Sequence, residues 1–381
     1  MIFPLERFNE TDTPFYYYDM DLLKATIGEI KANIEGEPFK VHYAIKANAN
    51  DRILSVIHDS GLGVDCVSGG ELAAALRAGF DGRKIAFAGV GKTDKEIEAG
   101  IDNDIFCFNV ESLPEMEIIN QIAARKGKKA NVAIRVNPNI DAHTHKYITT
   151  GLNENKFGIN LSQLDEMVEA TLNLPCVNFI GFHFHIGSQI METEPFVMLC
   201  EKVNELQDKY EKLGLKLKII NVGGGLGIDY NNPDGAAIPD FKTYFDIFKK
   251  NMRLRDGQEL HFELGRSVVA QCGSLITRVT YVKEGSAKKF VIVDAGMSDL
   301  IRPALYQAHH KIENISAHGS TTETYDVVGP ICESSDCFGT DETLGVTQRG
   351  DFLALRSAGA YGEIMASRYN CRKFPKAIYS E

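Results

Sequence analysis

The segment His42-Tyr-Ala-Ile-Lys-Ala-Asn48 decides how the rest of the chain is interpreted, because it places one lysine at the end of an apolar run. Residues 41–46 show the alternation of a buried strand, with Lys46 at the strand's exit. A lysine in this position is most often a solvated strand end. The alternative is a lysine whose amine forms a Schiff base with a carbonyl group of a substrate or cofactor. The other segments decide between these two interpretations.

Apolar strand-like segments alternate with amphipathic helix-like segments through the first two thirds of the chain. The predicted strands are 41–46, 62–67, 84–88, 105–110, 131–136, 179–186, 218–222 and 259–263. The predicted helices lie near 21–34, 51–60, 70–79, 93–100, 111–126, 161–171, 193–213 and 239–252. Short apolar strands that alternate with helices are typical of a (β/α)8 barrel, with a doubly wound sheet as the alternative. We therefore predict an α/β fold built on a TIM-type (β/α)8 barrel.

The pattern changes near residue 266, after which strand-like segments follow one another without long helices. This change predicts a second, C-terminal β-rich domain, a β-sandwich or β-barrel. The N-terminal strand Pro14-Phe-Tyr-Tyr-Tyr18 is expected to join that domain. We therefore predict a barrel domain over 20–265 and a β domain made of 1–19 plus 266–381.

Composition and charge limit the possible functions. The 381 residues are 44% hydrophobic, which is enough to bury the cores of two domains. The net charge of -11 disfavours nucleic acid and anionic membrane as partners, since both attract basic surfaces. We expect a cytoplasmic protein, because the sequence shows neither a signal-peptide pattern nor an apolar run of the ~20 residues that span a membrane. The scattered cysteines are expected to be free thiols.

Polar residues and one run of glycines stand at or near the ends of most of the predicted barrel strands, where a (β/α)8 barrel places its active site. They are Lys46, Asp65, Ser68, Asn109, Arg135, Asn137, His185, Ser188, Gly223-Gly-Gly225, Glu263 and Arg266. Consecutive glycines form either a tight turn or a backbone cradle for a phosphate. An acid such as Glu263 can pair with a protonated pyridine nitrogen, and Arg266 can bind a phosphate or a carboxylate. The lysine, the glycines and the carboxylate together describe a site for pyridoxal 5'-phosphate (PLP).

Two nucleotide-binding patterns are incomplete. The Gly223–Gly225 loop lacks the third glycine of a dinucleotide-binding motif, because Ile228 stands in its place. The segment Gly89-Val-Gly-Lys-Thr93 is one glycine short of an ATP-binding loop. Instead, Thr93-Asp-Lys-Glu96 matches a helix capping box, which explains the threonine without a nucleotide.

Two pairs of histidines are weighed as metal ligands and rejected. His183 and His185 lie two residues apart on one predicted strand. We expect only one of them to face the barrel mouth, and a core histidine is the simpler interpretation. His143 and His145 lie in a polar segment without a nearby acidic cluster. We therefore predict no metal site.

These motifs belong to a longer set of matching segments, with which the chain resembles the fold-type III PLP-dependent decarboxylases over nearly its full length. These enzymes have an alanine racemase-like barrel, and the resemblance is greatest to the family that decarboxylates diaminopimelate. The matching segments are Tyr43-Ala-Ile-Lys-Ala-Asn48, Asp65-Cys-Val-Ser-Gly-Gly-Glu71, Val136-Asn-Pro-Asn-Ile-Asp-Ala-His-Thr-His-Lys-Tyr147, Lys156-Phe-Gly158, His185-Ile-Gly-Ser188, Gly223-Gly-Gly225, Gly329-Pro-Ile-Cys-Glu-Ser334 and Gly359-Ala-Tyr361. The chain departs from the family at Glu263-Leu-Gly-Arg266, where a proline is usual in place of Leu264.

The resemblance implies a role for each matching position. Lys46 would hold PLP as a Schiff base, and Cys332 would enter from the partner subunit of a homodimer with shared active sites and donate the proton that replaces the lost carboxylate. His185 would stack on the cofactor ring and Glu263 would meet the pyridine nitrogen. The positions expected around the cofactor are Lys46, Asp65, His185, Ser188, Gly223, Gly224, Gly225, Glu263, Gly265, Arg266 and Tyr361. The positions expected at the far end of the substrate are Arg266, Arg302, Tyr306, Glu333 and Tyr361.

The implied reaction is PLP-dependent decarboxylation of meso-2,6-diaminopimelate to L-lysine and CO2, the last step of lysine biosynthesis. Within the same chemistry, the alternative is a decarboxylase of another basic amino acid or of carboxynorspermidine. A PLP racemase would need a second acid/base group opposite the lysine, and only one candidate besides Lys46 is found. A catalytically inactive regulatory homologue is disfavoured, because Lys46 and Cys332 are both present.

Overall fold

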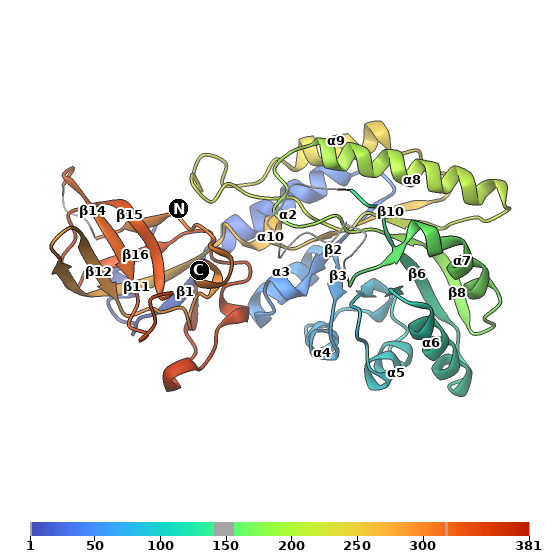
Figure 1. Ribbon diagram of the computed structural model, residues 1–381, viewed down its shortest axis with the longest axis horizontal. Coiled ribbons are helices and arrows are strands. Elements are labelled where there is room, and N and C mark those ends of the chain that lie inside the picture. Colours follow the sequence, from blue (N-terminus) through green and yellow to red (C-terminus); the bar gives the residue numbers. More distant parts are fainter. Residues whose placement is uncertain (1, 141–155, 317–318, 381) are drawn as a thin grey trace. The chain divides into compact units, whose positions relative to one another are not determined.

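The computed structural model describes residues 2–140, 156–316 and 319–380. The chain divides into two compact units (Figure 1). The barrel unit comprises Ile27–Gly227 and Asp240–Gly265, and the β unit comprises Met1–Thr26, Ile228–Pro239 and Arg266–Glu381. The sequence predicted a barrel domain over 20–265 and a β domain made of 1–19 plus 266–381. These domain boundaries remain a prediction. His143 and His145 lie outside the described residues.

The barrel unit contains a closed sheet of parallel strands, which confirms the predicted (β/α)8 barrel. Its strands are β2 (Phe39–Ala44), β3 (Gly63–Cys66), β4 (Ile85–Phe87), β5 (Cys107–Val110), β6 (Ala130–Asn137), β8 (Val177–His183), β9 (Ile219–Asn221) and β10 (Glu259–Leu264). Each strand pairs with the next in this order, and β10 pairs with β2 to close the ring. A short strand, β7 (Ile159–Asn160), pairs with β6 outside the ring.

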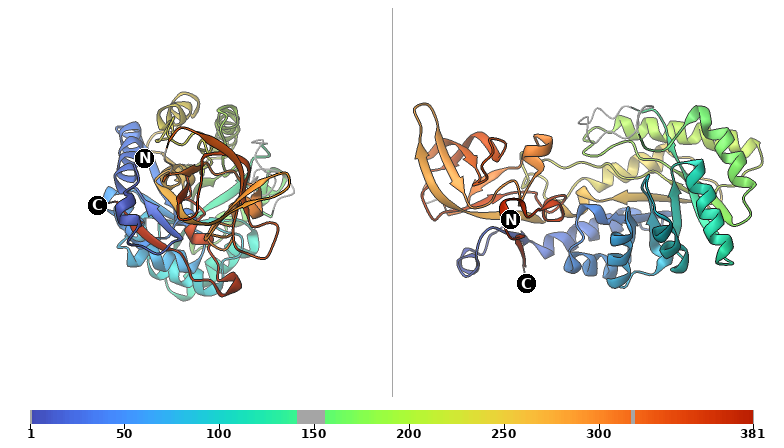
Figure 2. Two further views of the ribbon diagram at one scale, coloured as in Figure 1. Left: turned by 90° about the vertical axis from the view of Figure 1, so that its left-hand side faces the viewer. Right: turned by 60° about the horizontal axis from the view of Figure 1, so that its bottom comes forward.

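Helices lie outside these strands (Figures 1 and 2). They are α2 (Met20–Ile34), α3 (Asp51–Ser60), α4 (Gly69–Arg77), α5 (Asp94–Asp102), α6 (Leu113–Arg125), α7 (Leu164–Leu172), α8 (Glu194–Lys212) and α9 (Phe241–Asn251), with 3-10 turns η1 (Ile45–Ala47), η2 (Gly82–Lys84) and η3 (Leu161–Gln163). Helix α5 begins at the predicted capping box, in which Thr93 and Glu96 each accept a backbone N–H of the other. None of the helices in the described residues combines the length and apolar character required to cross a bilayer.

Aromatic packing fixes the position of strand β10, which carries Glu263. The rings of Phe245 and Phe248 on α9 lie 5.0 Å, centroid to centroid, from Phe262 on β10. All three side chains are fully buried, and burial of each stabilises the fold by about 1.5–3 kcal/mol. Since successive side chains of a strand point to opposite faces, anchoring Phe262 outward directs Glu263 into the barrel.

The β unit is built on an eight-stranded sheet. Its strands are β1 (Phe15–Tyr18), β11 (Gly273–Glu284), β12 (Lys289–Val293), β13 (Ile312–Asn314), β14 (Thr322–Val328), β15 (Cys337–Gly345), β16 (Phe352–Leu355) and β17 (Lys376–Tyr379). Its helices are α1 (Leu5–Phe8), α10 (Arg266–Val269) and α11 (Arg302–Tyr306), with 3-10 turns η4 (Glu363–Met365) and η5 (Tyr369–Cys371). Strand β1 pairs with β11 and β17, which confirms that the N-terminal strand belongs to the β-rich sheet.

Two predicted strand ends are wrong. Strand β2 ends at Ala44, and the backbone then forms the η1 turn, closed by the Asn48 N–H on the carbonyl of Ile45 at 3.0 Å. Strand β8 ends at His183 rather than at residue 186. Side-chain alternation predicts where a strand runs, but the point at which the backbone leaves its ladder depends on the neighbouring strand. Lys46 therefore lies in a turn beyond β2, and His185 lies in the segment after β8.

Candidate active site

The carboxylate of Glu263 lies at the centre of a polar cluster inside the barrel. Its Oε1 accepts hydrogen bonds from the side-chain amides of Asn109, at 3.0 Å, and Asn221, at 2.8 Å. Its Oε2 lies 3.0 Å from Nε2 of His183. These partners stand at the carboxyl ends of β5, β9 and β8, and Glu263 stands near that end of β10. Four strands therefore converge on one buried carboxylate.

Glu263 is held in its charged form. Burial acts to raise the pKa of Glu263, but His183 and Lys46 outweigh burial and keep that pKa well below its usual range. The neighbouring carboxyl group of Asp65 on β3 behaves in the opposite way. Burial, and then the charge of Glu263, raise the pKa of Asp65. Both Asp65 carboxyl oxygens lack a hydrogen-bond partner within the described residues, so this group is placed to meet a ligand.

Lys46 carries its positive charge into the same cluster. Its half-buried side chain projects from the turn after β2. Its charge acts to lower the pKa values of Asp65, Glu71 and Glu263, although burial raises the first two overall. The same charge acts against protonation of His185. A group that acts on all four lies among them, so Lys46 belongs to this cluster.

The ring of His185 is kept neutral. Burial, followed by the positive charges of Lys46 and Arg135, holds the pKa of His185 well below its usual value. Its Nδ1 accepts the backbone N–H of Gly224 at 3.3 Å. This contact ties the imidazole to the glycine loop, which gives the ring a fixed place beside the backbone of that loop.

Only glycine fits the loop Gly223–Gly225. A Cβ atom would lie 2.4 Å from the carbonyl oxygen of Phe184 at Gly223, and 2.0 Å from that of Glu263 at Gly224. Gly223 and Gly225 also have φ values of 69° and 116°, which other residues rarely adopt. The loop therefore brings bare backbone close to the end of β10. This geometry fits the predicted phosphate cradle, with Ser188 in the segment after β8 and Gly265 directly after β10.

A second cluster of predicted residues lies in the β unit. Nη1 of Arg266 donates to the hydroxyl of Tyr230 at 2.6 Å, and its guanidinium lies 4.9 Å from the ring centre of Tyr361. The guanidinium of Arg302 lies 5.3 Å from the ring of Tyr230 and 6.0 Å from that of Tyr306. The structure thus brings two buried guanidinium groups together on a frame of three tyrosines.

Arg302 is poised to receive an anion. Its Nε donates a hydrogen bond to Nε2 of His310 at 3.2 Å. Nδ1 of that histidine donates to the carbonyl oxygen of Arg356 at 2.9 Å. Burial, with the charge of Arg302, lowers the pKa of His310 to about 3, so His310 is a neutral acceptor. Burial also lowers the pKa of Arg302, as does the charge of Arg266. Within the described residues no carboxylate lies at ion-pair distance from Arg302, whose charge is therefore left for a ligand.

The loop between β14 and β15 carries Cys332 and Glu333 at the surface of the β unit. Glu333 accepts a hydrogen bond from the hydroxyl of Tyr369, which raises the pKa of that hydroxyl. The Cys332 thiol is exposed and forms no disulfide or hydrogen bond within the described residues. Both residues are available to meet another molecule.

The predicted residues therefore form two groups, one in each unit. The barrel unit holds Lys46, Asp65, His185, Ser188, Gly223, Gly224, Gly225, Glu263 and Gly265, and the β unit holds Arg266, Arg302, Tyr306, Cys332, Glu333 and Tyr361. The prediction that only one of His183 and His185 faces the barrel mouth is wrong, because both lie in the cluster around Glu263. Sequence reasoning also missed the roles of His183 and Asn221 as partners of Glu263. Asn221 could have been found, because it too is a polar residue at the end of a barrel strand. Tyr230 and His310 carried no recognisable signal.

Known proteins resemble the chain over its whole length. Residues 21–270 match the family model described as "Pyridoxal-dependent decarboxylase, pyridoxal binding domain". The chain is 58% identical over 381 residues to diaminopimelate decarboxylase of Bacteroides thetaiotaomicron, covering 100% of this chain and 98% of that protein. It is 43% identical over 376 residues to the enzyme of the same name from Helicobacter pylori, covering 98% and 91%.

Solved structures show the same relationship. The crystal structure of diaminopimelate decarboxylase from Helicobacter pylori complexed with L-lysine superposes with a TM-score of 0.93 at 42% identity, covering 99% of this chain and 94% of that one. Lysine decarboxylase from Selenomonas ruminantium superposes with a TM-score of 0.85 at 21% identity, covering 98% and 94%. At that identity the likeness is one of fold alone.

The partnership of His183 with Glu263 predicts a coupled effect on stability. His183→Ala should lower the free energy of unfolding at pH 7 by about 1–3 kcal/mol, because a buried carboxylate loses a hydrogen-bond partner. In a Glu263→Gln background the same substitution should cost much less. Chemical denaturation of the two single variants, the double variant and the exposed-site control His309→Ala measures this coupling.

The lowered pKa of Glu263 sets the pH range of the effect. Its stabilising contribution is complete above the usual glutamate pKa of about 4.3 and is lost as the pH falls toward the folded-state pKa. The coupling to His183 should therefore be present at pH 7 and should shrink below about pH 4. An equal cost of His183→Ala in both backgrounds at pH 7 would show that the histidine only fills space.

Proposed function

The chain belongs to the pyridoxal-dependent decarboxylases, and from this premise we propose that it converts meso-2,6-diaminopimelate to L-lysine and CO2 with PLP as cofactor. The observation that carries the proposal is the buried, charged Glu263 among Lys46, a neutral His185 and a side-chain-free glycine loop. The choice of substrate is supported by the relatives named above, which match the chain from end to end. A biosynthetic role of this kind supports a cytoplasmic location.

The barrel unit has the groups that a pyridoxal phosphate requires. When bound, PLP supplies a carbonyl carbon for a Schiff base and a pyridine ring that accepts the electrons released on decarboxylation. Lys46 would supply the amine for the resting Schiff base. Glu263, charged and fixed by three side chains, would hold a proton on the ring nitrogen. His185, neutral and tied to Gly224, would offer a flat uncharged face to the ring.

The remaining groups would hold the ends of the cofactor. The backbone of Gly223–Gly225 would bind the phosphate, together with Ser188, Gly265 and Arg266. Asp65, buried and without a hydrogen-bond partner in the described part of the chain, would face the ligand near Lys46. When Lys46 forms a Schiff base, its ammonium group becomes a less basic imine, and Asp65 loses a neighbouring positive charge. The raised pKa of the Asp65 carboxyl group allows it to be neutral there.

The β unit would bind the part of the substrate that does not react. Diaminopimelate differs from lysine by a second carboxylate at its far end, so its pocket must pair an anion as well as an ammonium group. Arg302, which has no carboxylate partner among the described residues, would bind that carboxylate, with Arg266, Tyr306 and Tyr361 beside it. Glu333 would pair with the distal ammonium group.

Assembly would complete the site. Cys332 is exposed in its own chain, and we infer that a homodimer presents it to the site of the partner subunit. There the thiol would donate a proton to the carbon from which CO2 has left, and this proton would form the new C–H bond that replaces the lost carboxylate. A proton donor from the other subunit would make decarboxylation dependent on dimer formation.

The first test of this function is the attachment of the cofactor. Reduction of the yellow holoenzyme with borohydride should fix PLP to the peptide that contains Lys46, because it converts the Schiff base into a stable secondary amine. Mass spectrometry of the digested protein identifies the modified lysine. Lys92→Ala, which removes another buried lysine of the barrel unit, is the control and should leave the labelling unchanged. Recovery of the label on a different lysine would contradict the assignment.

The second test concerns the substrate's far carboxylate. Arg302→Ala should lower kcat/KM for diaminopimelate by about 30- to 1000-fold, which corresponds to the 2–4 kcal/mol of an unpaired charged contact. Glu333→Ala should act in the same direction. PLP affinity, read from the absorbance of the bound cofactor, should not change. The exposed Arg349→Ala is a matched control, and Arg302→Lys separates loss of charge from loss of the two-pronged contact. Unchanged efficiency of Arg302→Ala would show that this arginine does not bind the substrate.

The third test concerns the shared active site. Lys46→Ala and Cys332→Ala chains should each be inactive alone and regain activity when mixed and allowed to exchange, because one site of each mixed dimer is intact. A theoretical ceiling of about one quarter of wild-type activity follows from random exchange. Exchange is verified with differently tagged chains. Verified exchange without any recovery would mean that each chain builds its own site.

A further inference from the structure

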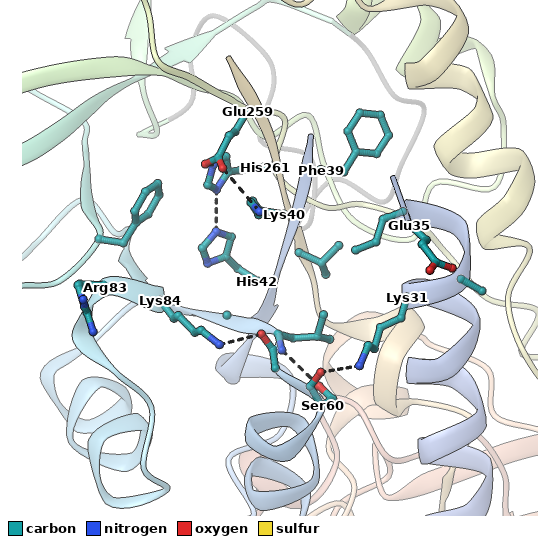
Figure 3. Close-up of a pocket in the computed structure, with 17 residues that line it drawn as sticks. Lys31, Glu35, Phe39, Lys40, His42, Ser60, Arg83, Lys84, Glu259 and His261 are labelled. Atoms are coloured by element: carbon teal, nitrogen blue, oxygen red, sulfur yellow. Dashed lines mark hydrogen bonds and ion pairs between the residues drawn. The ribbon is translucent and has the colours of Figure 1, made fainter. Parts of the chain in front are cut away.

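A separate cavity lies at the opposite end of the barrel strands (Figure 3). Phe39, Gly63 and Glu259, which begin β2, β3 and β10, all line it. Its volume of about 710 Å³ falls within the range of small-molecule sites. We call it the amino-end pocket. The candidate active site stands at the carboxyl ends of the same strands, so the pocket is distinct from it.

The inner wall of the amino-end pocket is apolar and partly flat. Val41 and Leu62 line it and are buried within the barrel unit. The ring of Phe106 lies parallel to that of His261, with centroids 4.8 Å apart and an interplanar angle of 11°. This stacked pair offers a flat surface of the kind that holds an aromatic or other planar group.

One of the two histidines in the wall, His42, is neutral because it is buried. Nε2 of His42 lies 2.8 Å from Nδ1 of His261, whose Nε2 lies 3.3 Å from Glu259. Burial, and then the proximity of His261, lower the pKa of His42 to about 4, so His42 is neutral.

The rim is basic in a protein that is acidic overall, with a net charge of -11. Lys31, Lys40, Arg83 and Lys84 line the pocket together with Glu35 and Glu259. Lys40 is paired with Glu259 at 3.6 Å, and Arg83 is paired with Asp81 beside the pocket. Lys31 donates to the carbonyl of Ser60 at 2.9 Å, and Lys84 donates to the carbonyl of Gly61 at 3.1 Å. Consecutive carbonyls thus draw the two ammonium groups to the same edge of the pocket (Figure 3).

These two ammonium groups keep their charge unneutralised. Within the ranges that the structure describes, no carboxylate lies at ion-pair distance from Lys31 or Lys84. Each ammonium uses one donor on a carbonyl and retains others for a ligand. Another cavity, of about 490 Å³ and lined by residues of the β unit, contains lysines that are paired with carboxylates. There Lys288 and Lys289 are paired with Asp326 and Glu323 at 3.0 and 2.7 Å.

We propose that the amino-end pocket binds a small organic anion. Its planar or apolar body lies against Phe106 and Leu62, and its carboxylate or phosphate group lies between Lys31 and Lys84. The cavity volume, the flat apolar wall and the two ammonium groups without a carboxylate partner support this assignment together. The proposal is independent of the reaction at the other end of the barrel, so its test needs no activity assay.

The test measures binding of the fluorescent anion 8-anilinonaphthalene-1-sulfonate to the PLP-loaded protein. Lys31→Met with Lys84→Met removes both charges and keeps the length of the side chains, and should weaken the affinity at least about tenfold, the effect of losing one charged hydrogen bond. The matched control is Lys95→Met with Lys216→Met, which removes two exposed lysines of the barrel unit outside the pocket. The control should bind as the wild type does. Ala32→Trp, at an exposed helix position on the pocket's edge, should block binding without removing a charge.

Competition identifies the anionic group. Benzoate and phenyl phosphate represent the two candidate groups, and benzyl alcohol is the uncharged counterpart. Displacement of the probe by either anion, and not by the alcohol, supports the proposal and tells which group is preferred. Thermal unfolding confirms that every variant is folded. Equal affinity of wild type and the Lys31/Lys84 variant, or displacement by benzyl alcohol as effective as by the anions, would overturn the proposal.

Discussion

The hydrogen bonds to the carboxylate of Glu263 are the interaction on which the rest of the site depends. A charged carboxylate buried without partners would be strongly destabilising or would bind a proton. Here Asn109, Asn221 and His183 satisfy it from three different strands, and Lys46 adds a compensating charge. The site therefore requires a closed barrel, because only closure brings β5, β8, β9 and β10 around one interior point.

The two carboxyl groups of the barrel illustrate how position sets chemistry. Glu263 has three hydrogen-bonding partners and stays charged, whereas Asp65 has none in the described residues and has a raised pKa. A charged carboxylate such as Glu263 suits a ring nitrogen that must keep its proton. A carboxyl group of raised pKa such as Asp65 suits a position next to a reacting amine. The same distinction applies to the arginines of the β unit. Arg356 is neutralised by Asp234 and Glu313. Among the described residues the Arg302 guanidinium has a neutral histidine as its hydrogen-bond partner and no carboxylate, so it can accept an anion.

Much of the fold could be predicted from the sequence. Short apolar runs between amphipathic segments located all eight barrel strands, and the capping box located the start of α5. The predicted ends of β2 and β8 were wrong, because each strand is followed directly by a buried apolar residue, Ile45 after β2 and Phe184 after β8, so the apolar pattern continues past the strand. The positions of Lys46 and His185 beyond those ends depend on backbone hydrogen bonds that no side-chain pattern records.

The site was less accessible to prediction than the fold. Residue types and their places at strand ends pointed to Lys46, Glu263 and the glycine loop. Which polar side chain contacts which depends on barrel closure, so the partnership of His183 and Asn221 with Glu263 could not be read from spacing. Tyr230 and His310 reach the arginine cluster from separate segments of the β unit and match no local motif. The basic rim of the amino-end pocket is likewise assembled from α2, β2 and the η2 turn, far apart in sequence.

The most direct measurement of the central claim is the release of CO2 from meso-diaminopimelate by the purified, PLP-loaded protein, beside ornithine, lysine and arginine at equal concentrations. The account predicts stoichiometric CO2 and L-lysine from diaminopimelate, with kcat/KM at least about 30-fold higher than for the three substrates that lack a distal carboxylate. Comparable turnover of ornithine, lysine or arginine, or no CO2 from diaminopimelate by a protein that has bound its cofactor, would contradict it.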